Sequence, residues 1–155
     1  MRVGWSQEKG ENLRELADFL GQYVVSRVIE DARAGAVSRF EGTAEISRDG
    51  TGAAYGESGA MMIGDQRFVA ERRYLWRANS VRIDVLFEDG RAFHDFDPEA
   101  GGLASAHLCG EDMYRGGYDF TDWPRWSVTW DVQGPRKAYK SVTWYERSAA
   151  FALAE

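Results

Sequence analysis

The feature that most constrains this chain is a series of short β-rich runs joined by turns that contain glycine. The segments Ile63-Gly64-Asp65-Gln66, Glu88-Asp89-Gly90-Arg91 and Cys109-Gly110-Glu111-Asp112 each place a glycine-containing pair between two such runs. A two-residue hairpin loop needs residues that tolerate positive φ, and it fixes which residues of the two strands lie opposite each other. The turns therefore predict the register of the strands as well as their positions.

Apolar and polar residues alternate over most of the chain after Gly21, as they do in strands that bury one face. Short runs bounded by turn residues predict ten strands, near residues 22–31, 36–48, 52–62, 67–77, 81–88, 91–96, 104–109, 112–120, 125–133 and 138–147. A short helix is expected before them, near residues 12–20, with Asn12 as its cap and Glu15 in the capping-box position. Its apolar face would close one end of the fold and comprises Leu13, Leu16, Ala17 and Leu20.

The connections between the strands are too short for the crossovers that parallel strands require, so the pattern predicts an antiparallel meander. We expect an all-β fold, an antiparallel up-and-down β-barrel of about ten strands with one short N-terminal helix, in a single domain over residues 1–155. A barrel removes exposed edges by pairing the first strand with the last, which ends near Arg147. An open sandwich of the same strands is the alternative.

Composition argues against several kinds of partner. The formal charge of −6 would repel the phosphates of a nucleic acid. The chain has no run of eighteen apolar residues, and residues 1–10 lack the apolar core of a signal peptide, so we expect no membrane insertion and a cytoplasmic location. A single cysteine, Cys109, cannot form an internal disulfide. The sequence does not indicate an oligomeric state.

The Gly64-Asp65 turn places Glu57 opposite Arg72 and Tyr55 opposite Tyr74, on the more aromatic face of the hairpin. We expect this face to point into the barrel. A buried carboxylate and guanidinium need each other or a ligand, because an isolated charge is costly to remove from water. The Glu57–Arg72 couple is therefore either a structural ion pair or a ligand anchor.

The Asp89-Gly90 turn allows two registers. A two-residue loop pairs Phe87 with Ala92 and Val85 with His94, which turns His94 inward. A three-residue loop with Gly90 in a bulge pairs Phe87 with Arg91 and turns His94 outward. We favour the first register, because it keeps the apolar face continuous, but the turn does not decide between them.

The remaining hairpins add to the same inward face. The Gly110-Glu111 turn pairs His107 with Tyr114 and Cys109 with Asp112, and the loop 134–137 pairs Trp130 with Ser141. Alternation in the first strand turns Arg27 inward as well. A mostly apolar interior with a few polar groups is typical of small-molecule sites. The candidate ligand-binding residues are the polar and aromatic members of this face: Arg27, Tyr55, Glu57, Arg72, Tyr74, His94, His107, Cys109, Tyr114, Trp130 and Tyr145.

The catalytic and metal-binding alternatives use the same residues. His107 is the first candidate for acid–base chemistry, followed by His94, Asp112 and Tyr114. Cys109 lacks the flanking residues of a known thiol nucleophile. The His107, Cys109, His94 and Asp112 spacing matches no zinc signature, so we predict no metal site. Either Arg27 or Arg72 would suit a carboxylate ligand, because a guanidinium binds carboxylates in a bidentate manner.

Three segments carry a family resemblance: residues 89–94, then His107-Leu108-Cys109 with Asp112 and Tyr114, then residues 130–137. They resemble an uncharacterised bacterial family of small lipocalin-like barrels, over nearly the whole chain from Tyr23 to Arg147. The expected fold is also similar to those of fatty-acid-binding proteins and of the nitrobindin haem barrels. Nitrobindins bind haem through a histidine near the C-terminal end of the barrel, whereas residues 141–155 contain no histidine. We therefore expect neither haem nor another cofactor.

The function that these observations favour is the binding or carriage of a small, partly apolar ligand inside the barrel, held by polar anchors. An enzyme that uses the same cavity for histidine-mediated acid–base chemistry is the alternative, and the sequence does not decide whether the protein is an enzyme. A structural or partner-binding role would instead require a filled interior and an exposed apolar patch.

Overall fold

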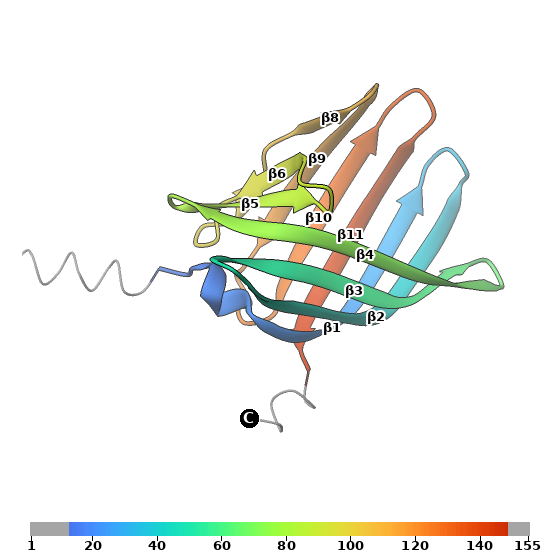
Figure 1. The fold of residues 1–155 in the computed structure, drawn as a ribbon. Helices are drawn as coiled ribbons and strands as arrows, with labels where there is room; N and C mark the ends of the chain where they lie inside the picture. Colours follow the sequence, from blue (N-terminus) through green and yellow to red (C-terminus); the bar gives the residue numbers. More distant parts are fainter. Residues whose placement is uncertain (1–12, 149–155) are drawn as a thin grey trace, which may run out of the picture.

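Eleven strands and one short 3₁₀ helix make up the computed structural model, which describes residues 13–148 (Figure 1). In chain order the elements are η1 (Leu16–Phe19), β1 (Gly21–Asp31), β2 (Ala36–Asp49), β3 (Gly52–Ile63), β4 (Gln66–Asn79), β5 (Arg82–Phe87), β6 (Ala92–Phe96), β7 (Gly102–Leu103), β8 (His107–Cys109), β9 (Asp112–Asp119), β10 (Trp126–Gln133) and β11 (Ala138–Arg147).

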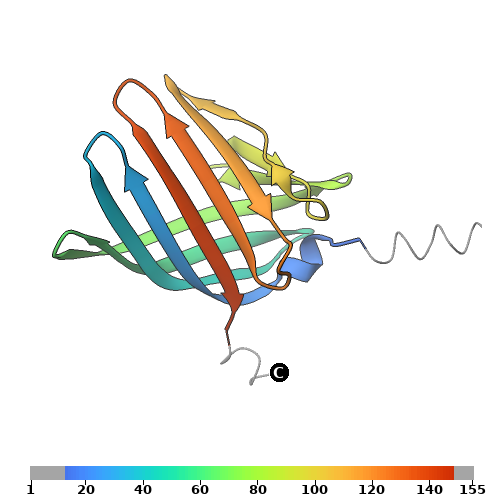
Figure 2. The ribbon, with the colours of Figure 1, turned by 180° about the vertical axis from the view of Figure 1, so that it is seen from behind.

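The strands form one antiparallel sheet that curls into a nearly closed barrel (Figures 1 and 2). The order of strands is β6-β5-β4-β3-β2-β1-β11-β10-β9, and β1 pairs with β11 from Tyr23 opposite Arg147 to Asp31 opposite Tyr139. The predicted pairing of the first strand with the last is therefore confirmed, and the open sandwich is excluded. The turns of the β1–β2 and β10–β11 hairpins lie at the end of the barrel away from η1.

The barrel is interrupted between β6 and β9, where a short segment joins the two strands. The Ala104 N–H donates to the carbonyl of Gly116 on β9 at 2.9 Å. The Ser105 N–H donates to the carbonyl of Asp95 on β6 at 3.1 Å, and the Asp95 N–H donates to the Ser105 hydroxyl at 2.9 Å. The predicted strand at 104–109 is therefore wrong as a single strand. Only residues 107–109 of it form a strand, β8, and the separate strand β7 precedes it. Both pair with β9, whereas Ser105 between them bonds to β6.

The other hairpins adopt the registers that their turns predict. The Gly64-Asp65 turn aligns Glu57 with Arg72 and Tyr55 with Tyr74. The Gly110-Glu111 turn aligns His107 with Tyr114, and the loop 134–137 aligns Trp130 with Ser141. Gly64 and Gly110 both have a φ near +60°, the left-handed conformation that these turns require.

The β5–β6 hairpin combines the two registers that its sequence allows. The Phe87 N–H donates to the Arg91 carbonyl at 2.8 Å, so the loop contains three residues with Gly90 at a φ of 94°. The predicted Phe87–Ala92 pair is therefore wrong. A bulge at Phe93 then absorbs one residue and restores the pairing of Val85 with His94. As a result His94 is buried, as predicted, and Phe93 also packs against the core.

The helix η1 closes one end of the barrel, but its buried face differs from the predicted one. Leu16 and Phe19 are buried, whereas Leu13 and Ala17 are exposed. A 3₁₀ helix has three residues per turn, so positions 16 and 19 share a face and the four-residue spacing does not apply. The cap is Glu15, whose N–H donates to the Asp18 carboxylate at 2.8 Å. Asn12, the predicted cap, lies outside the described residues.

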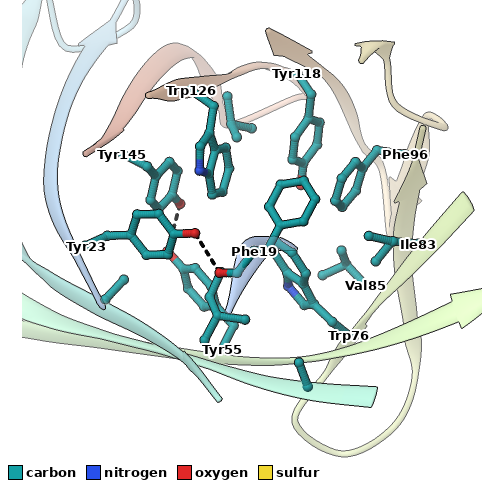
Figure 3. Close-up of a cluster of buried hydrophobic side chains, with 14 of the residues drawn as sticks. Phe19, Tyr23, Tyr55, Trp76, Ile83, Val85, Phe96, Tyr118, Trp126 and Tyr145 are labelled. Atoms are coloured by element: carbon teal, nitrogen blue, oxygen red, sulfur yellow. Dashed lines mark hydrogen bonds between the residues drawn. The ribbon is translucent and has the colours of Figure 1, made fainter. Parts of the chain in front are cut away.

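Phe19 is the centre of the core at this end (Figure 3). Its ring meets five other aromatic rings edge to face, with centroid distances from 5.0 to 6.0 Å: Trp76, Phe96, Phe120, Trp123 and Trp126. Edge-to-face contacts add to the free energy gained by removing the rings from water. This end of the interior is therefore filled with side chains. A ligand site can form only at the opposite end, the hairpin end, where the turns of the β1–β2 and β10–β11 hairpins lie.

We expect Phe19→Ala to lower the free energy of unfolding by about 3–5 kcal/mol, because it leaves a cavity among rings that cannot collapse. The matched control is Leu13→Ala, since Leu13 lies next to the same helix but is 45% exposed. Urea unfolding of both variants measures the difference. Equal, small losses in the two variants would contradict the assigned role of Phe19.

Candidate ligand-binding site

A buried ion pair lies at mid-height in the barrel. Alternation along β1 and β3 turns Arg27 and Glu57 inward, and both are 4% exposed. The Arg27 guanidinium donates to the two Glu57 carboxylate oxygens at 2.7 and 2.9 Å, and its Nε donates to the Thr143 hydroxyl at 2.7 Å. This bidentate arrangement is the strong form of a charge-assisted hydrogen bond. The partner of Glu57 is therefore Arg27, which lies two strands away on β1.

Two tyrosines extend this pair across the interior. The Tyr55 hydroxyl donates to Glu57 at 2.5 Å and lies 2.7 Å from the Tyr145 hydroxyl. Burial raises the pKa of Tyr145 to about 12, so its hydroxyl stays protonated at neutral pH. Burial is the largest single influence on the pKa of Glu57 and would raise it. The hydrogen bonds and charge of Arg27, with the Tyr55 hydroxyl and the charge of Arg72, together outweigh burial and hold that pKa below the ordinary value. Glu57 is therefore ionised and fully partnered.

His94 and Tyr118 form a second polar pair in the interior. The His94 Nε2 atom lies 2.7 Å from the Tyr118 hydroxyl. Burial lowers the pKa of His94 to about 3, because the surrounding rings replace the water that would solvate an imidazolium. The neutral imidazole packs edge to face against Phe93 and Trp130, with ring centroids 4.5 and 4.8 Å away.

A cavity of about 320 Å³ occupies the hairpin end of the interior. Its walls come from both sides of the barrel and comprise Arg27, Ile29, Arg72, Tyr74, Phe87, Phe93, His107, Cys109, Tyr114, Trp130, Tyr139 and Ser141. Phe93 stacks on Trp130 at 5.1 Å and on Phe87 at 4.8 Å, which makes one wall a continuous aromatic surface. Gly116 makes room for this wall, because a Cβ there would lie 2.7 Å from the Trp130 ring.

A smaller space of about 50 Å³ lies between this cavity and the closed end. Arg72, Tyr74, Phe93 and Trp130 line both spaces, so the two are neighbours in one interior. The deeper space also touches Glu57, His94 and Tyr118, whereas the larger one does not. The site therefore has a larger outer cavity with an aromatic wall and a floor, the deeper space, where the polar groups of Glu57, His94 and Tyr118 lie.

Arg72 is the cation of the site that is not neutralised at close range. It lies opposite Glu57 in the register, as predicted, but its Nε is 3.8 Å from the carboxylate and its side chain is 45% exposed. The predicted Glu57–Arg72 couple is therefore present only as a long contact, because Arg27 occupies both carboxylate oxygens. With Arg27 and Arg72 positive and Glu57 negative, the three side chains carry one net positive charge.

Polar side chains surround the rim of the cavity. Lys137 lies 3.6 Å from the Asp112 carboxylate and donates to the Tyr114 hydroxyl at 3.3 Å. Asp112 is thus paired with a lysine at the rim and does not point into the interior beside a histidine. Cys109 borders the cavity but is exposed, which corrects its predicted inward position. It lies one residue from the exposed turn, where alternation no longer decides burial.

The structure brings the predicted site residues together in two groups. His107 and Tyr114 line the larger cavity, and Tyr55, Glu57, His94 and Tyr145 line the deeper space, with Arg27, Arg72, Tyr74 and Trp130 touching both. Among the side chains that line the larger cavity, the prediction missed Ile29, Phe87, Phe93, Tyr139 and Ser141. Phe93 was missed because the bulge reverses its face, whereas the predicted alternation already placed Phe87 and Tyr139 opposite inward residues.

The described residues contain neither a cluster of possible metal ligands nor a helix that could cross a membrane. Among residues 13–148, no three side chains of His, Cys, Asp or Glu converge on a point that a metal ion could occupy. The same part of the chain has no helix that is long and apolar enough to cross a bilayer.

Comparisons with known proteins identify the fold. An S-type phycobiliprotein lyase, CPES, from Guillardia theta superposes with a TM-score of 0.60 at 7% identity, covering 86% of this chain and 90% of that chain. A protein of unknown function from the DUF3598 family of Nostoc punctiforme PCC 73102 gives a TM-score of 0.57 at 13% identity and covers 88% of this chain. The alignment spans 50% of that second protein. At such low identity the likeness concerns the fold alone.

The family comparison covers most of the chain. Residues 19–147 match a family model described as "Family of unknown function (DUF6314)". No curated protein matches the sequence.

We expect Glu57→Gln to lower the free energy of unfolding by about 3–5 kcal/mol at pH 7, because it leaves the Arg27 charge buried without a counterion. Asp49→Asn is the control, since it removes an exposed partner of Arg77 and should cost under about 1 kcal/mol. The folded pKa of Glu57 lies below the ordinary value of 4.5, so its ionised form adds stability above that pH. The difference between wild type and Glu57→Gln should therefore shrink as the pH falls through the folded pKa. A difference that stays constant from pH 7 to pH 3 would contradict this assignment.

We expect the His94 imidazole of the folded protein to stay neutral from pH 8 to pH 5, because its pKa is about 3. An unfolded histidine takes up a proton near 6.5, so burial of His94 costs stability as the pH falls below that value. Imidazole ¹⁵N chemical shifts measured during a pH titration test this expectation, with the urea-unfolded chain as the control. A titration midpoint above 6 for folded His94 would refute it.

Proposed function

The chain belongs to the DUF6314 family, whose function is unknown, and we propose from its cavity that it binds a small amphipathic molecule that carries an anionic group. The observation that supports this proposal is the combination, in one cavity, of a continuous aromatic wall and a cation without a close counterion. The aromatic side chains would contact the apolar part of the ligand. Arg72 would bind its anionic group.

The size of the cavity favours a small ligand. At about 320 Å³ it lies near the lower end of the range of roughly 300–1,000 Å³ that small-molecule sites span. Removal of apolar ligand surface from water by Phe87, Phe93 and Trp130 would supply most of the free energy of binding. The half-exposed rim beside Arg72 and Lys137 gives the polar end of such a molecule contact with water.

The charges favour an anion, and they favour Arg72 as its partner. The guanidinium of Arg27 already makes two hydrogen bonds to Glu57 and one to Thr143. Among residues 13–148, Arg72 has only the 3.8 Å contact with Glu57, so its donors remain available to a ligand. A carboxylate is the anion that suits a guanidinium best, since two parallel hydrogen bonds can form.

Binding is favoured over catalysis by the state of the histidines. His94, with a pKa of about 3, accepts no proton at neutral pH and cannot serve as a general base there. His107 lies beside Phe87 and Phe93 in the cavity wall, and Asp112 is paired with Lys137. Acid–base catalysis by His107 therefore stays a prediction from the sequence, and binding or carriage is the function that the geometry supports better.

The anion requirement can be tested with octanoate and the uncharged octan-1-ol as probes in isothermal titration calorimetry. Wild type should bind octanoate more tightly than octan-1-ol. Arg72→Met keeps the apolar stem and removes the charge, so it should weaken octanoate binding about 10- to 100-fold, since a charge-assisted hydrogen bond contributes about 1.5–3 kcal/mol. Binding of octan-1-ol should change little.

The matched control is Arg73→Met, which removes the same charge from the next residue of β4, on the outer face of the barrel. It should leave octanoate binding unchanged. Equal weakening by the two substitutions would mean that overall charge, and not the cavity, governs binding. Absence of octanoate binding to wild type would reject the proposed function.

A further inference from the structure

His94 has one ring nitrogen without a hydrogen-bond partner. Its Nε2 atom is held 2.7 Å from the Tyr118 hydroxyl, whereas its Nδ1 atom is buried and unpaired among residues 13–148. The side chain is more than nine-tenths buried, with a relative exposure of 8%. A buried polar atom that lacks a partner costs about 1–3 kcal/mol, so such an atom needs an explanation.

The contact with Tyr118 indicates which of the two ring nitrogens of His94 carries the proton. If the Tyr118 hydroxyl donates to Nε2, the imidazole proton sits on Nδ1, and one group in this pair lacks a partner. If Nε2 donates instead, both the Tyr118 hydrogen and the Nδ1 lone pair lack one within the described residues. The first arrangement satisfies more groups, so we assign the proton to Nδ1, which makes it an unused donor.

This donor belongs to a side chain that lines the ligand cavity's floor. His94 lines the deeper space of about 50 Å³, together with Arg72 and Tyr118. Arg72 also lines the larger cavity, so a molecule bound to Arg72 can extend toward His94. The rings of Phe93 and Trp130 lie against the imidazole on the way between the two spaces.

We propose that the His94 Nδ1–H group binds a neutral acceptor oxygen at the end of the ligand that lies opposite its anionic group. This inference rests on the proposed function and narrows its ligand class to small carboxylates that also carry a keto or hydroxyl oxygen. A second carboxylate would not suit the position, because the Glu57 carboxylate lines the same space and already pairs with Arg27, and the ligand's first anionic group takes Arg72.

An ordered water molecule is the competing occupant of the deeper space. The space is large enough for one water, which would need two to four polar partners there. In that case Nδ1 would be satisfied without a ligand, and ligands would not be distinguished by a distal oxygen. The protein should therefore prefer a ligand with a distal oxygen only if that oxygen, and not a water molecule, binds Nδ1.

The test compares octanoate with 7-oxooctanoate, which differ by a ketone oxygen at the end away from the carboxylate. Wild type should bind 7-oxooctanoate at least about fivefold more tightly, as expected for one additional hydrogen bond of about 1 kcal/mol. His94→Leu should remove this preference, so that the two acids bind to the variant with equal affinity. His94→Asn, which retains an N–H donor close to the Nδ1 position, should keep part of the preference.

Equal affinity of wild type for the two acids would overturn the proposal and support water as the occupant, while the proposed function would stand. Failure of wild type to bind either acid would reject the proposed function and this inference together. Imidazole ¹⁵N shifts of wild type provide a measurement that needs no variant. They should show the Nδ1–H tautomer at neutral pH, and the Nε2–H tautomer would overturn the assignment even if the His94 variants fail to fold.

Discussion

The ion pair between Arg27 and Glu57 is the interaction on which the interior of this barrel depends. It joins β1 to β3 across the intervening strand and occupies both oxygens of the carboxylate. Removal of two charges from water is costly. Close bidentate geometry offsets this cost, together with the hydrogen bond that Arg27 donates to Thr143 and the one that Tyr55 donates to Glu57. Because Arg27 occupies both oxygens of Glu57, Arg72 keeps spare donors at the rim. The same pair therefore stabilises the barrel and leaves a cation available.

The barrel interior changes in character from one end to the other. Around Phe19 the rings pack edge to face and fill the end of the barrel beside η1, so this end holds the strands together (Figure 3). Above the ion pair the rings of Phe87, Phe93 and Trp130 line a wall and leave about 320 Å³ open. The interruption of the barrel at Ser105 lies between β6 and β9, the two strands that supply Phe93 and Tyr114 to the cavity. One end of the barrel interior thus serves stability, and the other end serves the proposed binding.

Much of the fold could be predicted from the sequence, because short turns fix strand registers locally. The Gly64-Asp65 turn alone places Glu57 opposite Arg72, and this register is confirmed. Alternation then identifies the inward faces of β1, β3 and β10. The predictions that failed involve local features that the alternation of apolar and polar residues does not reveal. A bulge turned Phe93 inward, and a 3₁₀ helix buried Phe19 in place of Ala17.

The candidate site was less predictable than the fold, because its contacts cross the interior between strands that are distant in the sheet. Register places Arg72 beside Glu57, but the curvature of the barrel brings Arg27 closer to it, at 2.7 Å against 3.8 Å. The exposure of Cys109 follows from its place beside a turn, where a strand leaves the wall. The structure adds the distances and exposures of these residues to the sequence analysis, and their roles in ligand binding stay predictions.

The central claim is that a small anion binds inside the barrel, against the aromatic wall. The most direct measurement is the ¹H–¹⁵N spectrum of the tryptophan indoles during titration with octanoate. Trp130 lines the cavity, whereas Trp144 packs under Arg125 and lines neither of the two interior spaces. The account predicts a saturable shift of the Trp130 indole signal while the Trp144 signal stays in place. A shift of Trp144 with Trp130 unmoved would contradict it.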